Sequence, residues 1–68
     1  MNDTMNEMIA EVSPRVAENG YAFSRRTTAH GEIVLSAQIV NTGSKDNEFR
    51  KNWTLNGKRI SAAKLAAI

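Results

Sequence analysis

The chain has 68 residues, of which 41% are hydrophobic, and nine Lys and Arg against seven Asp and Glu give a formal net charge of +2. This length predicts one domain over residues 1–68, because domains commonly run to about 100–150 residues. The composition is that of an ordinary globular protein and argues against intrinsic disorder, collagen and coiled-coil rods. It does not point to any particular activity.

The chain contains no cysteine. This excludes disulfides, thiolate catalysis and every Cys-based zinc or iron–sulfur site. Small secreted chains usually depend on disulfides, so we expect a cytoplasmic protein. Residues 1–9 include Asp3 and Glu7 but no basic residue, which is unlike the start of a signal peptide. We expect no membrane association, because no apolar run approaches the roughly 20 residues that span a bilayer.

The N-terminal segment has the pattern of an amphipathic helix. Thr4 and Glu7 match a capping box, which predicts the start of the helix. Asn19-Gly20 predicts its end, since glycine readily adopts the left-handed conformation. Pro14 leaves two alternatives: it lies within one kinked helix, or Ser13 caps a second short helix that begins at Pro14. The apolar stripe falls at helical spacing and comprises Met5, Met8, Ile9, Val12 and Val16.

Two strands are predicted next, over residues 21–29 and 32–40. Tyr21 and Phe23 share one face of the first strand. His30-Gly31 predicts a tight turn, so the two strands form an antiparallel hairpin. The second strand has a mixed second face, which indicates a central strand partly covered on both sides. Its apolar face consists of Ile33, Leu35, Ala37 and Ile39.

The remaining elements follow a loop predicted at residues 41–47. A third strand over 48–55 is followed by Asn56-Gly57, the typical signal of a type I′ hairpin to a brief strand at 58–60. Ser61 is placed to cap a helix over 62–68 that turns Leu65 and Ile68 inward. One face of the third strand carries Phe49, Lys51, Trp53 and Leu55.

This order of elements predicts an α+β fold. It has an N-terminal amphipathic helix, a three- to four-stranded antiparallel sheet with helical cover on one face, and a short C-terminal helix.

Residues suited to catalysis are few and scattered. The only histidine, His30, falls in a turn, and Glu7, Glu11 and Glu18 fall on the solvated side of the first helix. The four glycines are isolated, so no phosphate-binding loop is present, and no ligand spacing suggests a metal site. We therefore expect no enzyme activity, no cofactor and no metal, because acid–base chemistry needs paired groups in a cleft.

The charge distribution is more informative. Residues 1–20 hold four acids against Arg15, whereas residues 21–68 hold eight basic residues against three acids. A basic sheet with an aromatic residue among its cations suits contacts to phosphates or to an acidic protein. The candidate contact residues are three basic pairs and one aromatic anchor: Arg25, Arg26, Arg50, Lys51, Lys58, Arg59 and Trp53.

Two considerations weaken this interpretation. Neighbouring strand residues point to opposite faces, so only one member of each basic pair can join a given patch. Basic residues on edge strands also serve simply to prevent aggregation. We expect a core this small to need most of the aromatic residues, so Trp53 is a core residue first and a contact residue second.

The order helix, three strands, helix resembles the double-stranded-RNA-binding domain. His30 stands in a turn comparable to that family's histidine-bearing loop, and residues 58–64 contain Lys58, Arg59 and Lys64 where the family grips phosphates. The resemblance implies phosphate contacts at the last helix. The chain departs from the family in its short last helix, in Ala62-Ala63 where the family has a Lys pair, and in Pro14. Residues 53–61 also resemble hairpins of small phage and mobile-element proteins, many of which are inhibitors.

We therefore expect a small non-enzymatic interaction protein, encoded by a phage or mobile element. It would dock through a basic sheet face on a host protein or nucleoprotein complex, such as defence or transcription machinery, and inhibit or modulate it. Two alternatives stay open: a DNA- or RNA-binding module that uses the same face, and a structural homo-oligomer subunit. A homodimer is compatible with each of them.

Overall fold

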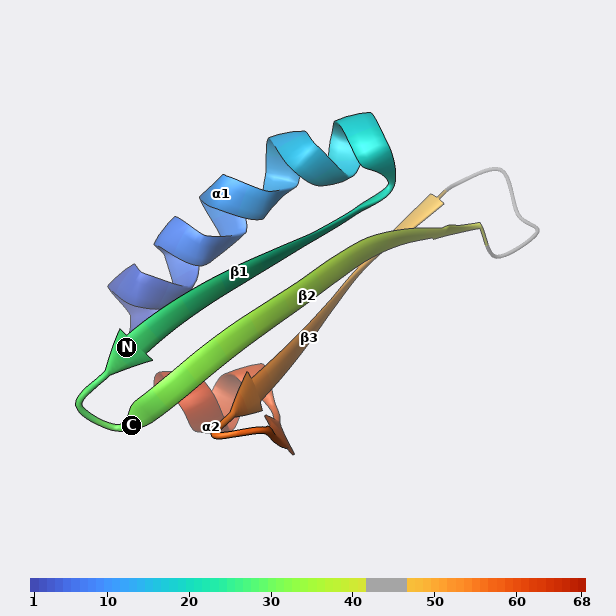
Figure 1. Cartoon of the computed structure of the whole chain (residues 1–68). Coiled ribbons are helices and arrows are strands. Elements are labelled where there is room, and N and C mark those ends of the chain that lie inside the picture. The colour runs from blue at the N-terminus through green and yellow to red at the C-terminus, as the bar shows by residue number, and fades with distance from the viewer. Residues whose placement is uncertain (42–46) are drawn as a thin grey trace.

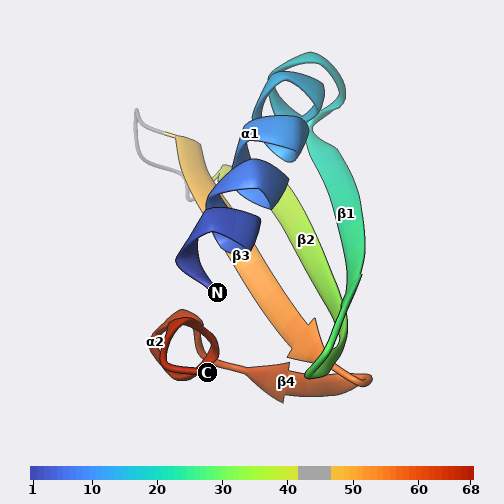
Figure 2. The same cartoon turned by 90° about the vertical axis from the view of Figure 1, so that its left-hand side faces the viewer.

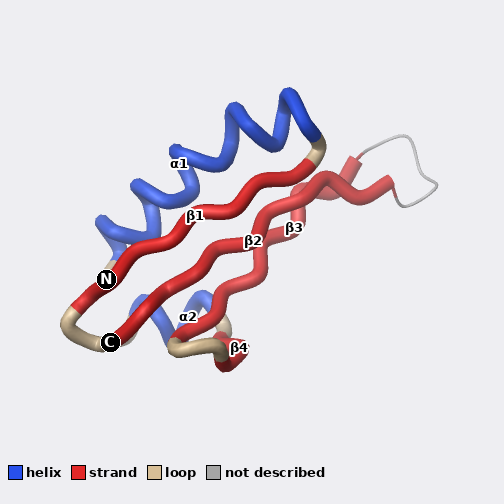
Figure 3. Tube along the Cα trace, viewed as in Figure 1, coloured by secondary structure: helices blue, strands red, loops and turns tan. Residues whose placement is uncertain are grey.

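The computed structural model describes the backbone of residues 1–41 and 47–68. Its elements are α1 (Asn2–Asn19), β1 (Tyr21–Thr28), β2 (Gly31–Asn41), β3 (Asn47–Leu55), β4 (Lys58–Ile60) and α2 (Ala62–Ala66) (Figure 1). The strands form one antiparallel sheet in the order β1-β2-β3-β4, and consecutive strands lie side by side (Figure 3). The predicted α+β fold is confirmed, and β2 is a central strand as expected. Most of the predicted loop falls outside the described residues.

Helix α1 begins earlier than its sequence pattern predicts. Its first residue is Asn2, and Met1 is the N-cap without a side-chain hydrogen bond. The predicted capping box at Thr4 and Glu7 is therefore wrong. Met1 packs, partly buried, against the core, and this contact accounts for the additional helical residues before Thr4. The predicted end is correct: Gly20 has φ 85°, and its N–H donates to the Val16 carbonyl at 2.8 Å.

The structure decides between the two alternatives for Pro14. Helix α1 continues through Pro14, which is exposed. The Ser13 hydroxyl does not cap a second helix but donates to the Ile9 carbonyl, one turn earlier, at 2.7 Å. Pro14 has no N–H to donate to the carbonyl one turn before it. Because that position faces solvent, water can satisfy the carbonyl, so the proline is tolerated within one helix.

The core lies between α1 and one face of the sheet (Figure 2). We call the side of the sheet that packs against α1 the covered face, and the other side of the sheet the open face. Because burial of each large apolar side chain contributes about 1.5–3 kcal/mol, this single layer of contacts holds the fold together. Helix α1 contributes Met5, Met8, Val12 and Val16; the sheet and α2 contribute Ala22, Ile33, Leu35, Ala37, Trp53 and Leu65.

Helix α2 is shorter than predicted. The Ser61 hydroxyl caps it, as expected, by accepting from the Lys64 N–H at 3.2 Å. Leu65 is fully buried, but the helix ends at Ala66. Ile68 is 41% exposed, so its predicted inward orientation is wrong. The helix ends before the residue that would have continued its apolar stripe.

Two tight turns set the strand register. Asn56 and Gly57 both have positive φ, 52° and 83°, as the predicted type I′ turn requires. Ala29 and His30 form the β1–β2 turn, one residue earlier than predicted, and β2 begins at Gly31 with φ 130°. The two turns are joined, because the Asn56 side-chain oxygen accepts from the Glu32 N–H at 3.0 Å.

We predict that Gly31→Ala strongly destabilises the fold. A Cβ at Gly31 would collide with the Asn56 side chain, at a φ that other residues avoid; the expected loss is about 3 kcal/mol. Gly57→Ala is the control, since its φ is also positive but a Cβ there meets nothing within 4 Å, and we expect it to cost about 1 kcal/mol. Urea unfolding measures both. Equal losses would show that the contact with Asn56 has no effect.

Candidate docking surface

The pairing register assigns every described strand residue to one face of the sheet, because directly opposed residues share a face. Helix α1 and the core occupy the covered face, as described above. The open face displays five rows across the strands, and no helix of the described chain lies on it (Figure 2). From one end of the sheet to the other, these rows are Val40–Glu48, Tyr21–Gln38–Arg50, Phe23–Ser36–Asn52, Arg25–Val34–Thr54–Arg59 and Thr27–Glu32.

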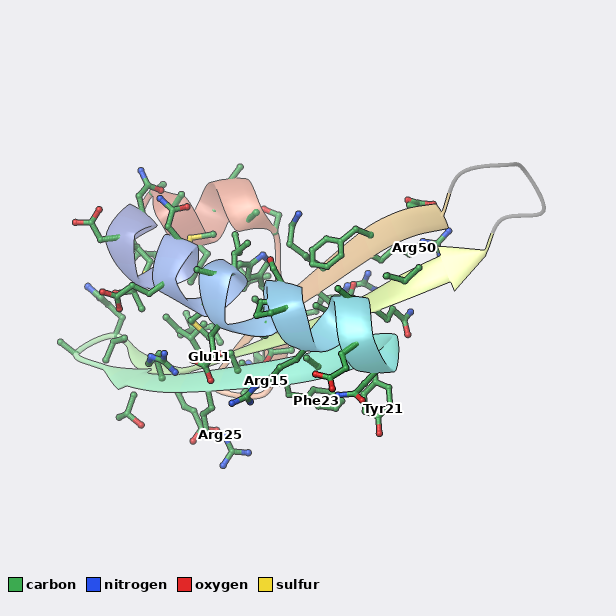
Figure 4. The ribbon with its side chains drawn as sticks, turned by 90° about the horizontal axis from the view of Figure 1, so that it is seen from above. Glu11, Arg15, Tyr21, Phe23, Arg25 and Arg50 are labelled. Carbon is green, nitrogen blue, oxygen red and sulfur yellow. The ribbon has the colours of Figure 1, made fainter. Side chains whose placement is uncertain are left out.

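Tyr21 and Phe23 dominate one end of the open face. They are 60% and 58% exposed, and their rings form an edge-to-face pair with centroids 6.1 Å apart. Figure 4 shows them next to each other on β1. The expectation that the core needs most of the aromatic residues is therefore wrong. The small Ala22 and Ser24 are buried in their place, which lets α1 pack closely on β1.

Each of the three basic pairs is divided between the two faces, as the alternation of strand side chains requires. Arg25, Arg50 and Arg59 belong to the open face, while Arg26, Lys51 and Lys58 belong to the covered face. The three open-face arginines do not form one cluster. Arg25 and Arg59 lie at opposite ends of one row, and Arg50 ends another. Figure 4 shows Arg25 and Arg50 far apart on the sheet.

Two carboxylates on the open face offset part of its positive charge. Glu32 lies 3.9 Å from Arg25, and Glu48 lies 3.3 Å from Arg50. Arg59 instead donates to the Asn52 side-chain oxygen at 3.1 Å. Both ion pairs are well exposed, so each contributes at most about 1 kcal/mol and can readily exchange partners. The open face thus combines an aromatic pair with charges of both signs.

Arg26 belongs to an ion pair that connects α1 to the sheet. Its guanidinium contacts the Glu11 carboxylate at 2.5 Å, and the Ser24 hydroxyl donates to the same carboxylate at 3.2 Å. Arg15 approaches Glu11 from within the helix at 4.0 Å. Glu11 is therefore not the freely solvated residue that the helical pattern predicts. The hydrogen bond from Arg26, aided by Ser24, lowers the pKa of Glu11 below its usual value, although partial burial opposes the shift.

The remaining predicted contact residues lie on or beside the covered face. The Lys51 ammonium lies 5.0 Å from the centroid of the Phe49 ring, in a cation–π arrangement. Lys58 is exposed at the β3–β4 turn. Trp53 is only 4% exposed, so its interpretation as a core residue is confirmed.

A hollow lies beside β4 in the described part of the surface. Its lining contains the cations of Lys51 and Arg59 but neither a carboxylate nor an imidazole. His30 lies elsewhere, in the β1–β2 turn, where its backbone N–H donates to the Thr28 hydroxyl at 3.2 Å. The full lining is Lys51, Asn52, Trp53, Arg59, Ile60, Ser61 and Ala62.

Metal-ligating side chains do not cluster in the described ranges. Within residues 1–41 and 47–68, no three His, Asp or Glu side chains come together as a metal site would need. None of the helices in these ranges combines the length and apolar character needed to cross a bilayer.

Comparisons with protein-family models, with curated proteins and with solved structures gave no match to this chain. The order α1, β1, β2, β3 agrees with the resemblance to the double-stranded-RNA-binding domain. Helix α2 has five residues, too few to provide the long phosphate-contacting helix that the resemblance implies, and β4 stands before it.

We predict that Glu11→Gln destabilises the protein at neutral pH. Because folding lowers the pKa of Glu11, its ionised form stabilises the folded state above its ordinary pKa, and this contribution is lost as the pH falls through the folded-state value. The difference in unfolding free energy between wild type and variant should therefore shrink in acid. Urea unfolding at neutral and acidic pH measures it. Glu7→Gln, on an exposed part of α1, is the control; an equal loss in both variants would contradict the role of Arg26.

Proposed function

We propose that this chain is a small non-enzymatic interaction protein that docks on a partner protein through the open face of its sheet. The observation that carries the proposal is the exposure of Tyr21 and Phe23, 60% and 58%, on a sheet face that no described element covers. Aromatic residues and arginine are the side chains most enriched at interface hot spots. Arg25, two residues beyond Phe23 on the same strand, extends the patch.

The charges of the open face favour a protein over a nucleic acid. Glu32 and Glu48 lie beside Arg25 and Arg50, and a strand of phosphates would meet these carboxylates as well as the arginines. Binding to nucleic acid depends on the net neutralisation of phosphates. An aromatic centre with charges of both signs around it is instead the composition of a protein–protein interface.

Docking of this kind would let the chain act on its partner by blocking part of the partner's surface. A partner that covers Tyr21 and Phe23 has its own surface covered in return, so binding blocks whatever else uses that surface. This fits an inhibitor or modulator of a host protein or nucleoprotein complex, such as defence or transcription machinery, in the cytoplasm. A phage or mobile-element origin is compatible with this role.

A second candidate function is single-stranded nucleic-acid binding. Two adjacent exposed rings with an arginine on the same strand also suit base stacking with phosphate contacts nearby. The docking proposal predicts no binding to single-stranded DNA, single-stranded RNA or duplex DNA at about 50 mM salt. Fluorescence anisotropy tests this. Micromolar binding that collapses at about 200 mM salt, and that Arg25→Ala and Arg50→Ala abolish, would replace the protein partner by a nucleic acid.

We predict that Tyr21→Ala/Phe23→Ala leaves the fold intact while removing the binding surface. Both rings are largely exposed, so the unfolding free energy should change by no more than about 0.5 kcal/mol per ring. Loss of each ring from a packed interface should weaken binding by about 10- to 100-fold. Urea unfolding checks the first statement. A loss of several kcal/mol would show that the rings belong to the core.

Positional photo-crosslinking checks the binding surface itself. A photoreactive amino acid replaces Gln38, which is exposed on the open face directly opposite Tyr21, or Ala10, which is exposed on α1. In the cells that produce the protein, position 38 should give a discrete adduct with another protein and position 10 should not. Excess wild type should compete for the adduct, and Tyr21→Ala/Phe23→Ala should not. Equal labelling from both positions, or an unchanged competition, would contradict the proposal.

A further inference from the structure

Strand β1 forms one outer side of the sheet, and its outer edge has no strand beside it in the described chain. The alternation of hydrogen bonds shows which backbone groups this edge presents. The Gly20 carbonyl accepts from the Ile39 N–H at 2.9 Å, so every second residue from Gly20 onward is bonded to β2. The N–H and C=O groups of the residues between them point outward: Tyr21, Phe23, Arg25 and Thr27.

This edge lacks three of the features that protect edge strands against pairing. All eight residues of β1 keep an unbroken register with β2, so there is no bulge, and the strand contains neither proline nor lysine. Its two charged residues are arginines that both have a carboxylate nearby: Arg25 lies beside Glu32 and Arg26 is paired with Glu11. Natural edge strands are normally blunted by such features or covered by another element. Here α1 packs on the face of the sheet and β1 remains at its outer side (Figure 2).

We infer that β1 pairs antiparallel with β1 of a second copy of this chain, about a two-fold axis perpendicular to the sheet. This inference goes beyond the proposed docking function and does not depend on it. A two-fold axis makes the interface self-complementary, and outward-pointing residues must oppose outward-pointing residues for the backbone bonds to form. Only a few registers meet this condition, and the side chains distinguish among them.

An axis at Arg25 would place two arginines directly opposite each other, which is destabilising. An axis at Phe23 would stack the two Phe23 rings but would limit the overlap to Tyr21–Arg25, because α1 ends at Asn19 just before the strand. An axis at Ser24 extends the overlap to Tyr21–Thr27. With this axis, Phe23 of each copy lies opposite Arg25 of the other copy, and both pairs have a favourable cation–π arrangement.

The dimer would be an eight-stranded sheet with both helices α1 on the same side. Its two open faces would form one continuous surface, with both aromatic pairs beside the seam. Dimerisation would also stabilise the fold, because binding stabilises the folded state that takes part in it. The core of a 68-residue chain rarely supplies more than about 3–5 kcal/mol by itself.

Single-cysteine variants test this register, because the chain has no cysteine of its own. With the axis at Ser24, the two Ser24 Cα atoms form a pair without backbone hydrogen bonds, about 4.5 Å apart, within the range that a disulfide bridges. Ser24→Cys should therefore form a covalent dimer under mild oxidation. Ser36→Cys is the matched control, since it lies on the open face of the central strand β2 and cannot meet its counterpart across β1. Cross-linking of Ser36→Cys equal to that of Ser24→Cys would indicate face-to-face packing and overturn the inference.

A proline variant tests the same interface without cysteine. Thr27 has an outward N–H and does not use it to pair with β2, so Thr27→Pro removes a donor from the outer edge alone. Sedimentation should show a wild-type dimer that dissociates at least tenfold more readily in Thr27→Pro but not in Thr27→Ala, with circular dichroism unchanged. A wild-type chain that stays monomeric up to millimolar concentration, or equal dissociation of the two Thr27 variants, would overturn the inference.

Discussion

The rest of the structure depends on the packing of α1 against one face of the sheet. The helix buries its apolar stripe there, with Met8, Val12 and Val16 fully inaccessible. In the described part of this 68-residue chain, α1 is the one long helix that provides this cover. Because one helix covers one face, the other face stays open, and whatever large side chains fall on it are exposed. The candidate docking surface is thus a direct consequence of the size of the protein.

Close contact between α1 and β1 explains which side chains are exposed. Ala22 and Ser24 occupy the covered positions of β1, and their small size lets the helix backbone approach the strand. The larger Tyr21 and Phe23 alternate with them and must take the open face. The exposure of two aromatic rings therefore follows from the space available beneath α1 rather than from their hydrophobicity.

The Glu11–Arg26 pair shows how tertiary contact changes the meaning of surface charge. The helical pattern makes Glu11 a solvated acid, and the strand pattern makes Arg26 a candidate contact residue. In the folded chain they neutralise each other across 15 residues of sequence, with Ser24 as a third partner. The carboxylates of Glu32 and Glu48 lie beside Arg25 and Arg50. With the Glu11–Arg26 pair, they leave the arginines of the open face as separate charges rather than one basic patch.

Local signals in the sequence determined the elements and their order. Gly20 stops α1, Asn56-Gly57 makes the hairpin and Ser61 caps α2, because each acts through the conformation or hydrogen bond of its own segment. Period-two alternation likewise assigns the two members of each basic pair to opposite faces of the sheet. The tertiary structure alone decided which face of β1 the helix covers, so the sequence could not place Tyr21 and Phe23 on the surface or pair Glu11 with Arg26. Alternation states which residues share a face, but only packing between distant segments determines which face is buried.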